Sequence, residues 1–107
     1  MNNSVIELVT YKLKTGATKS QLSATHSDVN VFLAEQPGFM YRSLSEDDNG
    51  LLYDIVYWQD MEKAKSAGEA FMAHKAGQAL VALTDENSIS MRHMEALTET
   101  SACTETV

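Results

Sequence analysis

Cysteine and proline are scarce in this sequence, since its 107 residues include only one of each. The single cysteine, Cys103, cannot form a disulfide within the chain, which excludes a small secreted domain held together by disulfides. The first residues, Met-Asn-Asn-Ser, also lack the basic segment and apolar core of a signal peptide. Both observations predict a cytoplasmic protein.

Long apolar runs and clustered basic residues are missing as well. The longest unbroken apolar run covers residues 79–83, whereas a membrane-spanning helix needs roughly 20 residues. Acidic residues number 15 against 8 basic ones, which gives a formal net charge of −7. Such a chain is repelled by phosphate backbones and anionic lipid, so we expect neither a nucleic-acid nor a membrane partner.

Motifs that would settle a reaction are also absent. The sequence has no glycine-rich phosphate loop, no Ser-His-Asp order typical of hydrolases and no C-x-x-C pair. Its three histidines show neither H-x-H nor H-x-x-x-H spacing, so we predict no metal site and no cofactor.

The sequence does contain enough apolar residues, 44%, for one hydrophobic core. Segments rich in β-branched and aromatic residues predict four strands, at residues 4–13, 39–45, 51–58 and 88–97. Asn49-Gly50, between the second and third of these, is typical of a tight hairpin turn because both residues tolerate positive φ angles.

The two ends of this pattern differ in composition. Residues 1–97 contain all the predicted elements and form one domain. Residues 98–107 are rich in threonine and glutamate and have too little apolar content to pack, so we predict a disordered tail.

Helical segments separate the strands. Thr18 and Gln21 form a capping box at the start of the first helix, and Pro37 ends it. Asp60 can cap the second helix. His74-Lys75-Ala76-Gly77 predicts a break in it, since glycine within a helix costs about 1 kcal/mol relative to alanine, and a short helical turn with Leu80 and Leu83 should follow. The order β-α-β-β-α-β predicts an α+β, ferredoxin-like antiparallel sheet with both helices on one face.

The strand pattern also predicts that the second face of the sheet is covered. Along residues 51–58 both alternating sets are apolar: Leu51, Tyr53, Ile55 and Tyr57 in one, Leu52, Val56 and Trp58 in the other. The helices cover only one face, and a second copy of the chain is the economical cover for the other. We therefore predict a homodimer through the sheet face, with Tyr57 and Trp58 as its leading interface residues.

Several stretches carry a resemblance to a known family. They are V-I-E-L-V-T-Y-K-L-K-T-G at the start, Q-P-G-F, Y-W-Q-D-M-E-K-A and A-F-M-A-H in the middle, and S-I-S-M-R-H-M-E near the end. Together they cover the chain from Val5 to Leu97, which resembles the dimeric α/β-barrel superfamily, in particular small proteins of the antibiotic-biosynthesis-monooxygenase type. The resemblance implies two ferredoxin-like subunits whose sheets face each other, with a pocket between helices and sheet in each.

The resemblance also implies several possible activities. Some members oxidise polycyclic aromatic polyketides with molecular oxygen and without metal or flavin. Others degrade haem, and others cyclise or isomerise small organic acids. Of the residues used by the haem-degrading branch, only His74 has a matching position here, so we do not expect haem chemistry.

Histidines are the candidate catalytic residues. His26 and His74 fall on the apolar stripes of the two helices, and His93 shares a strand face with Met91. Histidine titrates near neutral pH and suits acid–base work. We predict that His74 and His26 are catalytic and lie at the wall of a cavity between helices and sheet, with Phe71 nearby. Each could instead be a hydrogen-bonded core histidine.

The predicted substrate contacts are Phe71, Trp58, Tyr11, His93 and Arg92. The aromatic side chains could stack on a flat ligand, although the same strand spacing suits plain core or interface residues.

Two acidic residues, Glu7 and Asp54, lie mid-strand among apolar neighbours. Their strands should be adjacent in the sheet, where a bare carboxylate is costly. Arg42 and Arg92, also mid-strand, are the expected partners. The group is either a structural ion-pair network or a polar pocket floor that holds a carboxylate of raised pKa.

These observations lead to one main functional hypothesis and two alternatives. The main hypothesis is a homodimer that binds a small aromatic or quinone-like compound and, if catalytic, acts as a cofactor-independent monooxygenase. A histidine would deprotonate the substrate, and the anion would react directly with oxygen. The alternatives are a non-enzymatic ligand-binding or stress-related dimer, and a polyketide-cyclase or isomerase type of enzyme that transfers protons without oxygen.

Overall fold

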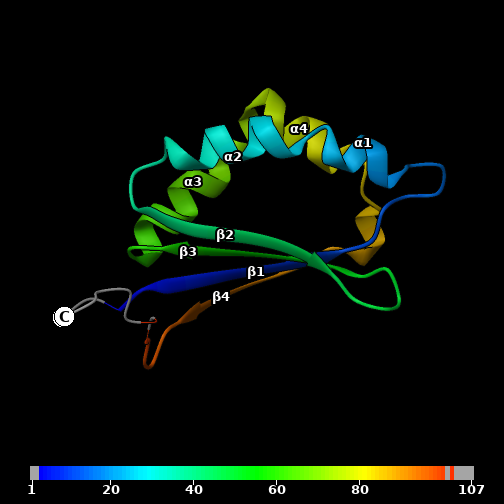
Figure 1. The fold of residues 1–107 in the computed structure, drawn as a ribbon. Helices are drawn as coiled ribbons and strands as arrows, with labels where there is room; N and C mark the ends of the chain where they lie inside the picture. The colour runs from blue at the N-terminus through cyan, green and yellow to red at the C-terminus, as the bar shows by residue number, and fades with distance from the viewer. Residues whose placement is uncertain (1–2, 101, 103–107) are drawn as a thin grey trace.

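The computed structural model describes residues 3–100 and residue 102. Its centre is a four-stranded antiparallel sheet with helices on one face (Figure 1). The strands are β1 (Val5–Tyr11), β2 (Phe39–Glu46), β3 (Leu52–Trp58) and β4 (Ser90–Glu95). Their spatial order is β2-β3-β1-β4, which confirms the ferredoxin-like α+β fold with β1 and β3 in the centre.

The helices differ in number from the prediction. They are α1 (Lys19–Ser23), α2 (His26–Ala34), α3 (Met61–Ala73), α4 (Lys75–Val81) and the short 3-10 helix η1 (Glu86–Ser88). The first predicted helix is thus two, joined at a turn in which the Thr25 hydroxyl donates to the Leu22 carbonyl at 2.7 Å. None of the helices among the described residues has the length and apolarity that crossing a membrane requires.

The predicted helix starts and the predicted hairpin are confirmed. The Thr18 side chain accepts from the Gln21 amide and the Gln21 side chain accepts from the Thr18 amide, which completes the capping box of α1. Asp60 caps α3 by accepting from the Lys63 amide at 2.9 Å. Between β2 and β3 the hairpin is present, and Gly50 has a positive φ of 83°, whereas Asn49 does not have a positive φ.

The predicted break in the second helix, at residues 74–77, is confirmed and lies at His74. His74 has an extended backbone between α3 and α4, and its Nδ1 accepts from the Ala76 amide at 3.0 Å. Gly77 lies inside α4 and is buried. A β-carbon there would overlap the backbone carbonyl of Phe71. Glycine is therefore needed so that α4 can fold back closely against the end of α3.

The core lies between the helices and the inner face of the sheet. Trp58, Val5 and Val29 are its largest fully buried side chains. Since Trp58 is only 1% exposed and belongs to this core, its predicted role as an interface residue is wrong. The physical reason is the strand parity: Trp58 pairs with Val5, whose side chain also points under the helices.

The outer face of the sheet, away from the helices, is apolar at its centre. Ile6 pairs with Tyr57, Leu8 pairs with Ile55, and Tyr57 pairs with Tyr41 on its other side. The Tyr41 and Tyr57 rings meet edge to face with centroids 6.1 Å apart, and Tyr41 remains 57% exposed. No helix of the described residues covers this face (Figure 1).

The predicted tail is only partly described. Leu97 is 95% exposed, and the Ser4 hydroxyl donates to the Glu99 carboxylate at 2.9 Å. Residues 101 and 103–107, which include Cys103, lie outside the described residues, so the tail prediction remains a prediction.

Candidate functional site

A cavity of about 300 Å³ lies between the helices and the inner face of the sheet. Most of its wall is apolar, and the residues that form this part include Val29, Leu33, Val56, Phe71, Met72, Leu80 and Met91. Its volume is at the small end of the range for small-molecule pockets, and such pockets combine an apolar wall with a few polar groups.

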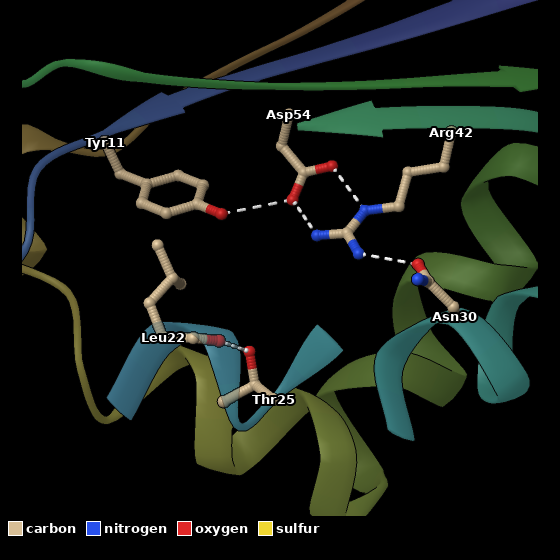
Figure 2. Close-up of polar contacts among 6 residues, drawn as sticks. All are labelled: Tyr11, Leu22, Thr25, Asn30, Arg42 and Asp54. Atoms are coloured by element: carbon tan, nitrogen blue, oxygen red, sulfur yellow. Dashed lines mark hydrogen bonds and ion pairs between the residues drawn. The ribbon is translucent and has the colours of Figure 1, made fainter. Parts of the chain in front are cut away.

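One polar group of the wall is a buried cluster on β1, β2 and β3. Arg42 binds Asp54 through two hydrogen bonds, Nε to Oδ1 at 2.9 Å and Nη2 to Oδ2 at 2.7 Å. The Tyr11 hydroxyl donates to Asp54 Oδ2 at 3.1 Å, and Arg42 Nη1 donates to Asn30 on α2 at 2.9 Å (Figure 2). Asp54 pairs with Val9 and with Leu44, so strand register places these side chains on the same inner face.

The electrostatics of this cluster keep it in one protonation state. Burial raises the pKa of the Tyr11 phenol, and the neighbouring Asp54 charge raises it further. Burial alone would lower the pKa of Arg42, but the hydrogen bonds and charge of Asp54 outweigh it and the net direction is upward. Tyr11 therefore stays a neutral phenol and Arg42 a cation at ordinary pH.

The other polar group of the wall is the Glu7 carboxylate on β1. Trp58 Nε1 donates to Glu7 Oε1 at 3.1 Å, and His93 Nε2 on β4 lies 3.6 Å from the same oxygen. The pKa of Glu7 is raised, with burial as the largest cause. His93 and the Trp58 hydrogen bond work against that rise, and the Asp54 charge adds to it.

The second oxygen of Glu7, Oε2, takes part in no hydrogen bond with residues 3–100. No side-chain nitrogen or oxygen of the described residues is both fully buried and without a partner. Oε2 is therefore not fully buried, and Glu7 belongs to the cavity wall.

The wall of the cavity includes three of the residues predicted as substrate contacts. Tyr11, Trp58 and Phe71 all lie in its wall. His93 is connected to the wall through Glu7, as their pairing across β1 and β4 requires.

Arg92 lies elsewhere. It pairs with Leu8 and is exposed on the outer face of the sheet. The expectation that Arg92 partners a mid-strand acid is therefore wrong, whereas the expected pairing of Arg42 with Asp54 is confirmed. The cause is strand parity, since a shift of one residue moves a side chain to the other face.

His26 and His74, the predicted catalytic residues, are not among the residues of the cavity wall, so their predicted placement there is wrong. His74 is exposed, caps α4, and packs against Phe32 with ring centroids 4.8 Å apart. Its position on an apolar stripe assumed that the helix continues, but α3 ends at Ala73. His26 begins α2 and is half-buried.

Several wall residues could not be found from single motifs. Gly68 and Met72 come from α3, Thr84 follows α4, and Ile89 precedes β4. Alternation within one strand or helix does not reveal them, because the fold-back of α4 and the loop after it bring them together. Among the described residues, no group of three or more potential metal ligands converges.

No family model and no curated protein matches this sequence, but several solved structures share its fold. A cofactor-independent oxygenase from Streptomyces nogalater, SnoaB, aligns with a TM-score of 0.66 at 17% identity over 92% of this chain and 96% of its own. A Bordetella bronchiseptica protein, named provisionally as an antibiotic biosynthesis monooxygenase, aligns with a TM-score of 0.76 at 9% identity over 91% and 100%. A Nitrosomonas europaea protein with the same provisional name aligns with a TM-score of 0.73 at 14% identity. The alignment covers 94% of this chain and 97% of that protein.

The chain thus has the ferredoxin-like α+β fold of antibiotic-biosynthesis-monooxygenase-like proteins, as the resemblance of its sequence implied. At identities of 9–17% the likeness is one of fold, so the chemistry has to be argued from the cavity itself.

Proposed function

We propose that this protein is a homodimer that binds a small aromatic or quinone-like compound in the cavity and oxidises it as a cofactor-independent monooxygenase. The observation that carries the proposal is the cavity of about 300 Å³, whose wall is largely apolar and holds Glu7 and Tyr11. The fold shared with a cofactor-independent oxygenase supports the choice of reaction class.

The cavity suits a flat, apolar ligand. Phe71 offers a half-buried ring in the wall, which also includes the buried Trp58, and aromatic pairs prefer stacked or edge-to-face contact. The sulfur-containing side chains of Met72 and Met91 adapt to the outline of a ligand. A hydroxyaromatic compound would place its rings among these groups and its hydroxyl near the polar residues.

The reaction needs a carbanion-like substrate and molecular oxygen. Deprotonation of a hydroxyaromatic compound makes its ring electron-rich, and a ring carbon then forms a bond to oxygen. One oxygen atom stays in the product, and the other leaves as water, so that a phenol becomes a quinone. The protein contributes binding, orientation and proton transfer.

The outer sheet face supports the homodimer. Ile6, Leu8, Ile55 and Tyr57 are only half-buried in the single chain, and Tyr41 is largely exposed beside them. Monomeric proteins seldom leave such a contiguous apolar patch open. A second copy that presents the same face would cover it through a self-complementary contact. We place this dimer in the cytoplasm.

Oxygen uptake with 1-naphthol as the probe tests the proposed reaction. We expect uptake and a naphthoquinone that carries one atom from labelled oxygen. Binding without uptake would favour the non-enzymatic dimer, and product formed without oxygen would favour the cyclase or isomerase; either result overturns the oxygenase. Native mass spectrometry of freshly purified protein reports the stoichiometry and any retained ligand.

A matched pair of variants ties the activity to the cavity. Gly68 lies in the wall, and a β-carbon there would meet nothing within 4 Å. Gly68→Leu should therefore fill part of the cavity and abolish binding. Ala70→Leu adds the same side chain to the same helix at an exposed position and should leave binding unchanged.

A further inference from the structure

Most hydrogen-bond donors of the cavity wall are already engaged within the protein. Trp58 Nε1 donates to Glu7, the Tyr11 hydroxyl donates to Asp54, and the Thr84 hydroxyl donates to the Val81 carbonyl at 2.8 Å. Arg42 uses three of its five N–H groups to donate to Asp54 and Asn30.

The Glu7 carboxylate, in contrast, has spare capacity as an acceptor. Glu7 Oε2 takes part in no hydrogen bond with residues 3–100. The phenolic oxygen of Tyr11 uses its proton for Asp54, and the neighbouring Arg42 acts on the same oxygen. A ligand that reaches this end of the cavity therefore meets a carboxylate oxygen that can accept a hydrogen bond.

Glu7 and Tyr11 lie on the same face of β1, each two residues from Val9, and both line the cavity. Asp54, which accepts from the Tyr11 hydroxyl, lies near enough to Glu7 for its charge to raise the pKa of Glu7. The two groups therefore share one region of the cavity wall.

The charge of the wall also favours a ligand that donates a hydrogen bond. Arg42 neutralises Asp54, so an ionised Glu7 leaves this end of the cavity negative unless His93 is protonated. A carboxylate or phosphate ligand would face the like charge of Glu7, which disfavours its binding. A neutral ligand with a hydroxyl group would instead donate a hydrogen bond to Glu7.

We propose that the cavity selects neutral hydroxyaromatic compounds through a hydrogen bond from the ligand hydroxyl to Glu7, and that Glu7 takes the proton of this hydroxyl. The inference rests on the proposed function, because it assumes that the cavity binds an aromatic compound. In the transfer the ligand O–H bond breaks, the proton binds Glu7 Oε2, and both electrons stay on the ligand oxygen as an aryloxide.

The surroundings of Glu7 favour this role. Burial raises its pKa and so brings its basicity closer to that of a phenol, which makes it a better proton acceptor than a carboxylate in water. Trp58 and His93 both contact Oε1 and therefore leave Oε2 as the oxygen for a ligand hydroxyl. His93 acts as a positioning residue.

Three naphthalene probes test the ligand class on the full-length protein: 2-naphthol, 2-methoxynaphthalene and 2-naphthoate. We expect 2-naphthol to bind at least about tenfold more tightly than the other two, since a hydrogen bond to a charged group contributes about 1.5–3 kcal/mol. In Glu7→Gln the preference for 2-naphthol over 2-methoxynaphthalene should fall below about threefold, because the amide is a weaker acceptor.

Glu69→Gln is the matched control, because it removes one negative charge from an exposed position on α3. It should keep the wild-type preference, and thermal unfolding should show that both variants fold. Equal binding of 2-naphthol and 2-methoxynaphthalene to the wild type would overturn the ligand class while leaving the cavity as a binding site. If none of the three probes binds, the proposed function itself fails.

Fluorescence tests the proton transfer separately. Excited 2-naphthol is a much stronger acid than in its ground state and emits as the anion when a base lies beside its hydroxyl. We expect anion emission from the probe bound to the wild type and to Glu69→Gln, and its loss in Glu7→Gln. Equal anion emission from bound probe in Glu7→Gln would overturn the role of Glu7 as proton acceptor.

Discussion

Arg42 and Asp54 face each other across β2 and β3 with two parallel hydrogen bonds, 2.9 Å and 2.7 Å long. Their side chains are only 7% and 10% exposed, so each charge depends on the other for compensation. The Tyr11 hydroxyl donates a further hydrogen bond to Asp54, and Arg42 donates one to Asn30. The pair joins the sheet to α2 at the edge of the cavity.

Replacing Arg42 alone should lower the free energy of unfolding strongly, whereas replacing both Arg42 and Asp54 should lower it much less. Arg42→Met leaves a buried carboxylate uncompensated, and we expect a loss of about 3–5 kcal/mol in the free energy of unfolding. Arg42→Met combined with Asp54→Leu should recover most of this loss. Urea unfolding measures all three proteins. Lys19→Met is the control, because the Lys19–Glu46 pair is largely exposed and contributes little. A double variant that is no more stable than the single one would contradict this account.

The close approach of α4 to the end of α3 gives a second prediction. A β-carbon at Gly77 overlaps the backbone carbonyl of Phe71, and backbone cannot move aside as a flexible side chain can. Gly77→Ala should therefore lower the free energy of unfolding by at least about 3 kcal/mol, at or beyond the upper end for overpacked sites. The same change at Gly68, which meets no atom within 4 Å, should raise it by up to about 1 kcal/mol. Equal effects at both sites would show that α4 is free to move.

The helix starts and the hairpin could be predicted from the sequence because they depend on residues that are close together in the chain. Capping residues act on their own helix, so Thr18, Gln21 and Asp60 could be assigned from their spacing alone. The turn at Gly50 likewise depends on the backbone of one or two residues. The role of Gly77 could not be predicted from such local rules. Its effect on helix propensity predicted a break, but its actual role depends on Phe71, which reaches it only through the tertiary fold.

The site was harder to predict because it depends on register between segments. Arg42 and Arg92 look equivalent in sequence, yet pairing places Arg42 beside the inner-face residues and Arg92 on the outer face. His74 lies at apolar-stripe spacing but follows the last residue of α3. The aromatic wall residues Phe71 and Trp58 were found, because large apolar side chains on the inner face must contact either the core or the cavity.

The outer sheet face gives a prediction on assembly. At micromolar concentration, sedimentation should yield about twice the chain mass of 11.8 kDa. Tyr57→Asp places a charge at the centre of the apolar face, between Ile6 and Tyr41, and should shift the protein to monomer or unfold it. Val31→Asp places the same charge at a 55% exposed position on α2 and should leave the dimer intact. A wild-type monomer at this concentration would refute the dimer.

The raised pKa of Glu7 makes a distinct prediction for the pH dependence of stability. Its ordinary value is 4.5, and burial raises it in the folded protein. Between 4.5 and the raised value, the folded state binds more protons at this site than the unfolded state does. The contribution of Glu7 to the free energy of unfolding therefore falls as pH rises through this window and is constant on either side.

Glu7→Gln isolates this contribution, because the other titrating groups remain in both proteins. The unfolding free energy of the variant minus that of the wild type, measured with urea, should increase as pH rises above about 4.5 and then level off. Two charged groups on neighbouring strands face Glu7: His93 on β4, which opposes the rise when it is protonated, and Asp54 on β3, which adds to it. Glu69→Gln should show no such increase. A difference for Glu7→Gln that decreases with rising pH would mean that His93 lowers the pKa of Glu7 more than burial raises it, and that Glu7 is too weak a base to accept the proton of a bound phenol.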